Sequence, residues 1–163
     1  MSKLKTPSAT DAAPAGGAGG VDPLRLDLQL CFALYSAANK VTRLYRPLLE
    51  PLGLTYPQYL TMMALWETSP RTVGDLGEAL GLDSGTLTPL LKRLEASGYV
   101  ARARDPADER RVVVTLTPAG VALKAQAAHV PGALACQLGC DLDEIVELRE
   151  KLKQLNQSAK ASR

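Results

Sequence analysis

The stretch over residues 72–116 limits the possible folds more than any other part of the chain, because its hydrophobic period changes from helical to alternating. A short helix is predicted over residues 73–80, with Gly81 as its stop, and a second over residues 84–97, with Gly98 as its stop. The second helix carries an inward stripe of leucines at helical spacing: Leu87, Leu90, Leu91 and Leu94. Two short helices joined by about three residues are typical of a helix-turn-helix.

The residues after Gly98 follow the period of a β-hairpin. Apolar and arginine side chains alternate over residues 100–104, turn-forming residues follow, and a second alternating run covers residues 112–116. A hairpin with arginines around its turn, directly after a helix-turn-helix, has the form of a winged helix. The sequence therefore predicts a mainly α fold with a small β-hairpin wing.

A long apolar helix is predicted before the winged helix. The pattern runs from Leu24 to about Tyr45, where Pro47 should end or kink the helix. Both faces of this helix are largely apolar, and such a helix is usually buried between other elements. In a protein this small, we expect that burial at an interface between subunits.

The two ends of the chain differ in character. Residues 1–23 are rich in Ala, Gly and Pro and have too few large apolar groups to offset the entropy of ordering, so we expect a disordered tail. After the wing, Thr117 caps a helix that runs to about residue 128. Residues 133–138 are predicted to form one turn, and Asp141 begins a last amphipathic helix.

Composition narrows the classes of function. With 163 residues, of which 46% are hydrophobic, the chain can form one domain with a core. It has no run of about 18 apolar residues and no signal-peptide core, so we expect a cytoplasmic protein without membrane contact. One histidine and three cysteines without paired Cys-x-x-Cys units argue against zinc, and neither a metal nor a cofactor is predicted. A net charge of +2 is too small to indicate nucleic-acid binding by itself.

The second short helix and the wing carry the residue types of a DNA-binding surface. Residues near the start of such a helix reach base edges in the major groove, and flanking basic groups hold phosphates. Those positions are Ser84, Thr86, Thr88, Pro89, Lys92 and Arg93. Arg110 and Arg111 at the wing suit a narrow minor groove. Any single one of these is more often an ordinary surface residue, but helix, wing and charge in this order favour double-stranded operator DNA as a partner.

The segment GTLTPLLKRLEASGYVARARDPADERRVVVTLTPAG resembles the helix-and-wing region of MarR-type regulators, which are homodimeric winged helix-turn-helix repressors. Their DER signature matches Asp108 to Arg110. The resemblance implies that this aspartate pairs with this arginine to set the wing, and that the arginine enters the minor groove. The chain further resembles the OhrR branch, whose members sense organic hydroperoxides. The segments that carry this resemblance are LCFALYSA, TYPQYL, LWE and LDSGTLTPLLKRLE.

The resemblance covers roughly residues 24–155. It implies one MarR-type domain over residues 24–163, with dimerisation helices over residues 24–55 and 117–160 and a DNA-binding winged helix over residues 56–116. The resemblance is to homodimers, so the partner subunit would be a second copy of the chain. In a two-fold dimer, a contact between two different positions occurs twice, once in each direction.

Cys31 and the tyrosines that follow it form a second candidate site. Cys31 and Tyr45 share a helix face, but fourteen residues at 1.5 Å each separate them by roughly 20 Å. Cys31 also lies too far into the predicted helix for the helix dipole to help much, so phenols are the expected donors to its thiolate. Tyr56 lies beyond a proline and a glycine, and we therefore expect one or both phenols to come from the partner subunit. The resemblance to OhrR agrees, with Cys31 reactive and Tyr45 and Tyr56 stabilising its thiolate, whereas a lone cysteine is otherwise more often a core residue.

A sulfenic acid condenses readily with a second thiol. The resemblance to two-cysteine OhrR proteins implies that Cys136 is the resolving thiol across the dimer, with Cys140 either inert or a substitute. We therefore expect a repressor, not an enzyme, that binds operator DNA when reduced. Organic hydroperoxide would oxidise Cys31, and an intersubunit disulfide with Cys136 would release the DNA. The alternatives are a MarR-type repressor controlled by a reversible phenolic ligand and, less favoured, a thiol peroxidase, which would have no reason for a basic winged helix.

Overall fold

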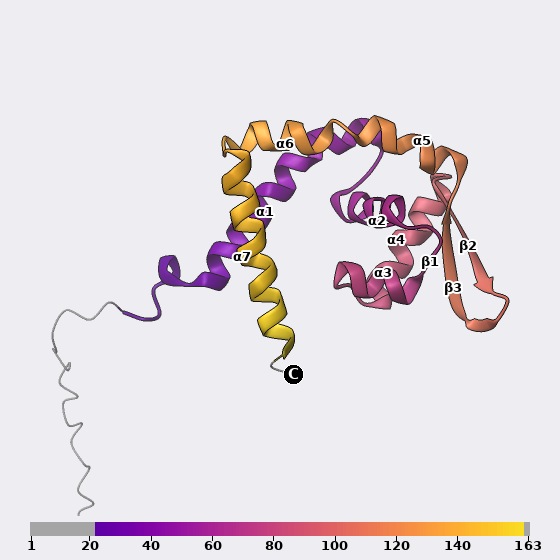
Figure 1. Cartoon of the computed structure of the whole chain (residues 1–163), viewed down its shortest axis with the longest axis horizontal. Coiled ribbons are helices and arrows are strands. Elements are labelled where there is room, and N and C mark those ends of the chain that lie inside the picture. The colour runs from indigo at the N-terminus through magenta and orange to yellow at the C-terminus, as the bar shows by residue number, and fades with distance from the viewer. Residues whose placement is uncertain (1–21, 162–163) are drawn as a thin grey trace, which may run out of the picture. The chain divides into compact units, whose positions relative to one another are not determined.

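The computed structural model of the protein describes residues 22–161 (Figure 1). The chain divides into two compact units, residues 1–36 and residues 37–163. The disordered tail predicted over residues 1–23 lies, apart from its last two residues, outside the described part of the chain. Within residues 22–161, no helix is long and apolar enough to cross a membrane.

The first long helix, α1, starts later than its hydrophobic pattern predicts. It covers Leu30–Leu49, and a separate 3₁₀ turn, η1, covers Leu26–Leu28, so the predicted start at Leu24 was wrong. The break lies at Gln29, whose backbone is extended and whose side-chain amide donates to two preceding carbonyls at 2.6 and 3.1 Å. The apolar period continues across this break, and for that reason the period alone does not reveal it.

Pro47 does not end α1. The helix continues to Leu49 and passes into a second 3₁₀ turn, η2, over Glu50–Leu52. Leu49 is 1% exposed, and its burial in the core offsets the backbone hydrogen bond that the proline cannot make. Gly53 then reverses the chain in the left-handed region, with φ of 65°.

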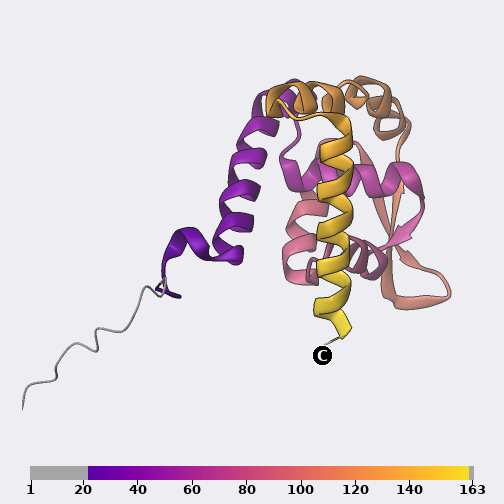
Figure 2. The same ribbon diagram turned by 60° about the vertical axis from the view of Figure 1, so that its left-hand side comes forward.

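The middle of the chain forms the predicted winged helix. Its elements are α2 Tyr56–Glu67, β1 Arg71–Thr72, α3 Val73–Leu80, α4 Ser84–Ala96, β2 Val100–Asp105 and β3 Asp108–Leu116. Figures 1 and 2 show the hairpin of β2 and β3 extending away from α3 and α4. The prediction of a mainly α fold with a helix-turn-helix followed by a β-hairpin wing is therefore confirmed.

The sheet contains a third strand that the sequence pattern did not indicate. The strand order is β1-β3-β2, and both pairings are antiparallel. Strand β1 is two residues long and pairs with residues 113–114 of β3. In the hairpin, Val100 lies opposite Leu116, which is the register that the predicted alternation requires.

Side-chain caps fix the starts of the two helices of the helix-turn-helix. Thr72 and Asp75 form a reciprocal capping box at the start of α3, with both bonds 3.1 Å long. At the start of α4, the Asp83 carboxylate accepts the Thr86 N–H at 2.9 Å. Gly81 between the helices has φ of 64°, a conformation that residues with a Cβ rarely adopt.

Most of the core lies within the winged helix. All four predicted leucines of α4 are buried: Leu87, Leu90, Leu91 and Leu94. They form one cluster with Met62 and Leu65 of α2, Leu76 of α3 and Val114 of β3. Burying one such side chain contributes about 1.5–3 kcal/mol, so this cluster fixes α4 against its neighbours.

Three helices follow the wing: α5 Pro118–Ala127, α6 Val130–Leu138 and α7 Leu142–Ala161. Helix α6 is longer than the single predicted turn, because Pro131 lies in its first turn, where no amide donor is needed. Several large apolar side chains of α1, α5 and α7 stay exposed: Leu30, Phe32, Tyr35, Val121, Val146, Leu148 and Leu155. Such surfaces are typical of interfaces between proteins.

Candidate functional site

Three tyrosine rings gather where α1 meets α2, and we call Tyr45, Tyr56 and Tyr59 the phenol cluster. The rings of Tyr45 and Tyr56 stack, with centroids 4.5 Å apart and 30° between their planes. The Tyr59 ring, one turn further along α2, lies 5.9 Å from that of Tyr45. The two predicted thiolate partners are therefore neighbours within one chain. Sequence reasoning missed Tyr59, although its spacing of three from Tyr56 places the two side by side on a helix.

The turn between α1 and α2 positions the phenol cluster. Gly53 reverses the chain, and the Gln58 side-chain carbonyl then accepts the Thr55 backbone N–H at 2.8 Å and its hydroxyl at 3.0 Å. These bonds form a capping box and fix the start of α2 at Tyr56. The first ring of α2 is thereby directed back against Tyr45 of α1.

Burial disfavours ionisation of the phenols. Desolvation, with smaller contributions from Tyr56 and Tyr59, raises the pKa of Tyr45 from its ordinary 10.0 to about 12. Desolvation also raises the pKa of Tyr56 and, together with the neighbouring Tyr56 phenol, that of Tyr59. The hydroxyls of Tyr45 and Tyr56 have no hydrogen-bond partner among residues 22–161. At neutral pH both are O–H donors that an adjacent anion can use.

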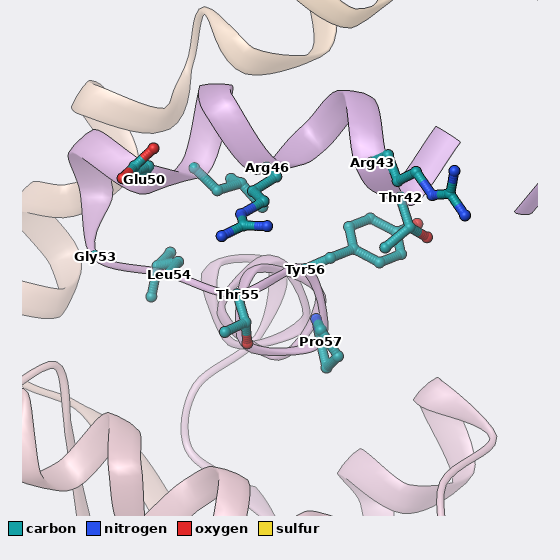
Figure 3. Close-up of a pocket in the computed structure, with 10 residues that line it drawn as sticks. Thr42, Arg43, Arg46, Glu50, Gly53, Leu54, Thr55, Tyr56 and Pro57 are labelled. Carbon is teal, nitrogen blue, oxygen red and sulfur yellow. The ribbon is translucent and has the colours of Figure 1, made fainter. Parts of the chain in front are cut away.

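A pocket of about 650 Å³ opens beside Tyr56, between α1 and the start of α2 (Figure 3). It is lined by Thr42, Arg43, Arg46, Leu49, Glu50, Gly53, Leu54, Thr55, Tyr56 and Pro57. Figure 3 shows the Tyr56 ring extending from the start of α2 toward Thr42 on α1. Arg43 and Arg46 are exposed and form no ion pair within the described part of the chain. The pocket can therefore accept an apolar group next to a phenol donor.

Cys31 is the second residue of α1 and carries a free, exposed thiol. The expectation that it lies too deep in its helix for the dipole to act was wrong, because α1 starts at Leu30. The field of a helix is strongest in its first turn, where it favours an anion such as a thiolate. Cys31 belongs to the unit over residues 1–36 and the phenol cluster to the other unit, so their approach to one another stays a prediction.

Cys136 and Cys140 are also free and exposed. Cys136 lies in α6, Cys140 precedes α7, and Gly139 between them is left-handed with φ of 63°. The Cys140 thiol donates weakly to the Leu138 carbonyl at 3.6 Å. Within residues 22–161, no group of three or more His, Cys, Asp and Glu is arranged to hold a metal ion. Both thiols are accessible to another sulfur.

The exposed face of α4 carries all the base-reading and phosphate-binding residues predicted on this helix: Ser84, Thr86, Thr88, Pro89, Lys92 and Arg93. Two of the hydroxyls are already engaged. That of Thr86 donates to the Asp83 carboxylate at 2.9 Å, and that of Thr88 donates to the Ser84 carbonyl at 2.7 Å. The bonds from the Thr86 N–H and hydroxyl lower the pKa of Asp83. The cap of α4 therefore also orients the side chains that face outward.

An ion pair that sequence reasoning missed joins α4 to the wing. Arg102 of β2 donates from Nε and Nη2 to Oε2 of Glu95 at 2.9 and 2.5 Å, and from its backbone N–H to Oε1 at 3.1 Å. The side-chain bond is the main cause of the lowered pKa of Glu95. Arg102 is one of the alternating arginines of the predicted hairpin, but this partner neutralises its charge. The two residues meet only because the chain reverses at Gly98.

Asp108 sets the turn of the wing through the backbone. Its carboxylate accepts the Arg110 N–H at 3.0 Å, a bond that short Asp side chains make two residues ahead. The two residues thus pair through the Arg110 backbone, and no ion pair joins their side chains in the described part of the chain. The Arg110 side chain is exposed and remains available to a partner.

A cleft of about 360 Å³ lies between the wing and the helix-turn-helix. It is lined by Thr72, Val73, Gly74, Ser84, Thr88, Leu91, Arg102, Arg110, Arg111 and Val112. The structure thus brings Ser84, Thr88, Arg110 and Arg111 to one surface. Thr86, Pro89 and Arg93 line a separate hollow of about 200 Å³ toward α2.

Comparisons of the sequence with known proteins find transcriptional regulators. Residues 43–126 match the family model described as transcriptional regulator SarA/Rot. The chain is 52% identical to the HTH-type transcriptional regulator TtmR of Methylorubrum extorquens over 134 residues, which are 82% of this chain and 69% of that protein. It is 47% identical to the organic hydroperoxide resistance transcriptional regulator of Bacillus subtilis over 127 residues, which are 76% of this chain and 86% of that protein.

Solved structures share the fold. Reduced AbfR of Staphylococcus epidermidis bound to DNA matches with a TM-score of 0.74 at 37% identity, over 85% of this chain and 94% of that chain. Disulfide-formed AbfR matches with a TM-score of 0.60 at 38% identity, over 81% and 93% of the two chains. AbfR has thus been seen both on DNA and with a disulfide.

Proposed function

This chain belongs to the MarR-type winged-helix transcriptional regulators of the SarA/Rot family, in the organic-hydroperoxide branch, and on this premise we propose that it is a repressor controlled by oxidation of Cys31. The reduced homodimer binds operator DNA, with α4 in the major groove and the wing in the minor groove. Ser84, Thr86, Thr88 and Pro89 face bases, and Lys92 and Arg93 hold phosphates. Arg110 and Arg111 enter the minor groove, and Asp108 holds the turn from which they project.

The sensing site combines two protomers. The phenol cluster and its pocket in one protomer receive the start of α1, with Cys31, of the partner subunit. Three observations support this arrangement. The Tyr45 and Tyr56 hydroxyls have no partner among the described residues of their own chain, the pocket beside Tyr56 is open, and Leu30 and Phe32 next to Cys31 are exposed apolar groups. Burying these apolar groups would stabilise the dimer.

The chemistry begins with the thiolate of Cys31. It is stabilised by O–H donation from Tyr45 and Tyr56 and by its place in the first turn of α1. The sulfur attacks the distal oxygen of an organic hydroperoxide, the O–O bond breaks, and the alkoxide leaves as an alcohol after taking a proton. Cys31 is oxidised to a sulfenic acid. The hydroperoxide is the oxidant, so no further reagent is needed.

The Cys136 thiolate of the other protomer then attacks the Cys31 sulfur. A disulfide forms, and hydroxide leaves as water after protonation. A disulfide holds the two α-carbons about 5.5 Å apart, so sulfurs that start further away must be brought together by movement of the backbone. Such a movement changes the spacing of the two α4 helices, and the operator is released.

The observation that carries this proposal is the pair of protonated, stacked phenols of Tyr45 and Tyr56 beside an open pocket. The test is a titration with cumene hydroperoxide, followed by DNA binding and non-reducing gels. Wild type should lose DNA as the covalent dimer appears, and Cys31→Ser should stay on DNA. If Cys31→Ser dissociates as readily as wild type, Cys31 is not the sensor.

The pocket also supports a second function, a repressor released by a reversible phenolic ligand. Its volume of about 650 Å³ and the unpaired Arg43 and Arg46 suit a small aromatic acid. Release by such a ligand would proceed under full reduction and in Cys31→Ser, which separates the two functions. In either case the protein acts stoichiometrically on cytoplasmic DNA and is not an enzyme, in contrast to a thiol peroxidase, which would turn over hydroperoxide without DNA.

A further inference from the structure

The phenol cluster continues as a chain of contacts toward the base of the wing. The Tyr59 ring lies 5.9 Å from that of Tyr45 and meets the Trp66 ring edge-on at 6.2 Å. Tyr59 is 2% exposed, so the core holds its ring on all sides. The Trp66 indole N–H then donates to the Gly120 carbonyl of α5 at 2.8 Å.

Gly120 lies at the junction between α5 and the start of the wing. A Cβ on Gly120 would lie 2.0 Å from the Tyr99 carbonyl oxygen, so the two backbones are in direct contact. The same oxygen accepts the Thr117 N–H at 3.1 Å, and the Thr117 hydroxyl donates to the Gly98 carbonyl at 2.6 Å. The N-cap residue of α5 is therefore bonded to two of the three residues that connect α4 with β2.

Trp66 contacts α5 at a second point, because Lys124 donates from Nζ to the Trp66 carbonyl at 3.3 Å. The indole and the backbone of one residue thus both bond to the helix that leaves the wing. Packing alone would account for an aromatic ring in this place. The two hydrogen bonds to one helix make Trp66 a directional link between α2 and α5.

We propose that Tyr59 and Trp66 are positioning residues that couple oxidation of Cys31 to the Gly98–Gly120 junction, and through it to α4 and the wing. The proposal rests on the proposed function, because the signal starts when Tyr45 loses the thiolate that it holds. A displaced Tyr45 ring meets Tyr59, which has no free volume to absorb the movement. The displacement then reaches Trp66 and the carbonyl of Gly120, and so the segment that fixes the angle between α4 and the hairpin.

Trp66→Phe tests the link, because it keeps an aromatic ring at this position and removes the donor to Gly120. The matched control is Thr61→Val in the same helix, which removes the buried hydroxyl bond to the Pro57 carbonyl, 2.9 Å long. The full-length proteins are titrated onto a labelled duplex that reduced wild type selects from a random pool. Binding is measured before and after cumene hydroperoxide, and free Cys31 thiol is counted in the same samples.

We expect Trp66→Phe to oxidise as fast as wild type but to lose DNA affinity about fivefold less on oxidation, the factor equivalent to one hydrogen bond. Thr61→Val should respond like wild type. An equal loss of affinity in Trp66→Phe and wild type at equal oxidation overturns the coupling. If wild type itself oxidises at Cys31 without releasing DNA, the proposed function fails instead, so the two failures are distinguishable.

A spectroscopic measurement on wild type decides the matter if Trp66→Phe does not fold. Trp66 is the only tryptophan of the chain, so emission excited selectively from tryptophan reports this residue alone. Coupling requires its emission to change with the same rate constant as DNA release after oxidation. Emission that is identical in the reduced and oxidised dimers contradicts the proposal.

Discussion

The rings of Tyr45 and Tyr56 stack with their centroids 4.5 Å apart, so α1 and α2 of one chain present two phenol donors at a single point. If these donors hold the Cys31 thiolate, each contributes a hydrogen bond to a charged group, which is stronger than one between neutral groups. The Tyr56 ring lines the pocket and the Tyr45 ring stacks against it, whereas the donation depends only on the hydroxyls. The two contributions can therefore be separated by substitution.

Tyr45→Phe and Tyr56→Phe should each slow the oxidation of Cys31 by about tenfold or more, because the ring stays and the donor is lost. The rate is measured by stopped-flow loss of thiol with cumene hydroperoxide. Tyr99→Phe is the control, since the Tyr99 hydroxyl donates to the Leu52 carbonyl at 3.2 Å, outside the cluster. If both Tyr45→Phe and Tyr56→Phe leave the rate of Cys31 oxidation unchanged, the phenols do not activate this thiol.

The raised pKa of Tyr45 predicts a loss of stability in alkali. The phenol ionises near its ordinary 10.0 in the unfolded chain and near about 12 in the folded one. Between these values the folded state keeps a proton that the unfolded state has lost, so stability present below pH 10 declines as the pH rises toward 12. The free energy of unfolding, measured with urea, should fall more steeply over this window for wild type than for Tyr45→Phe. Parallel curves would show that Tyr45 ionises normally.

Arg102 and Arg110 should differ in how they affect DNA binding. Arg102 is paired with Glu95, whereas Arg110 has no ion-pair partner in the described part of the chain. Arg110→Gln should lower the slope of log affinity against log salt by about one, because one positive charge that displaces counterions from the DNA is lost. Arg102→Gln should weaken binding by roughly tenfold with the slope unchanged, because it frees the wing from α4. A reduced slope in Arg102→Gln would show that this side chain contacts phosphate.

Gly120→Ala should destabilise the fold by at least about 2 kcal/mol, because a Cβ there must displace the Tyr99 backbone. Gly132→Ala is the matched control. Its Cβ would meet nothing within 4 Å on an exposed turn of α6, and alanine should be neutral or stabilise by about 0.5–1 kcal/mol. Both values come from urea unfolding of the reduced protein. Equal stabilities would mean that the junction has room to relax.

Cys136→Ser should abolish the peroxide-induced covalent dimer while Cys31 still forms a sulfenic acid, which a dimedone adduct detects by mass. Cys140→Ser should leave the covalent dimer intact. The basis is that the Cys140 thiol already donates to the Leu138 carbonyl, at 3.6 Å. A covalent dimer that persists in Cys136→Ser and vanishes in Cys140→Ser would assign the resolving role to Cys140.

The sequence predicted those parts of the fold that depend on local chemistry. Helix α3 and its stop at Gly81 follow from residues a few positions apart, as does the buried leucine stripe of α4. The boundaries of α1 did not follow. Its start depends on an extended residue, Gln29, within a continuous apolar pattern, and its end depends on tertiary burial of Leu49. Strand β1 is too short for any period and exists only because β3 lies beside it.

The candidate site divides in the same way. The residue types and order of the DNA-binding surface follow from the sequence, and so do Cys31, Tyr45 and Tyr56 through the family resemblance. The Glu95–Arg102 pair and the contact of Trp66 with Gly120 join residues that are distant in the chain or separated by a turn, and no spacing indicates them. The error about the helix dipole at Cys31 came directly from the misplaced start of α1.

The hydroxyls at the start of α4 have a consequence for the bases that this helix can distinguish. Thr86 and Thr88 each have one proton, and both protons are already donated, to Asp83 and to the Ser84 carbonyl. What these side chains can offer to the major groove is lone pairs. Exposed amino groups occur there on adenine N6 and cytosine N4, whereas guanine and thymine present acceptors. We therefore expect the operator positions under these two threonines to favour adenine or cytosine on the contacted strand.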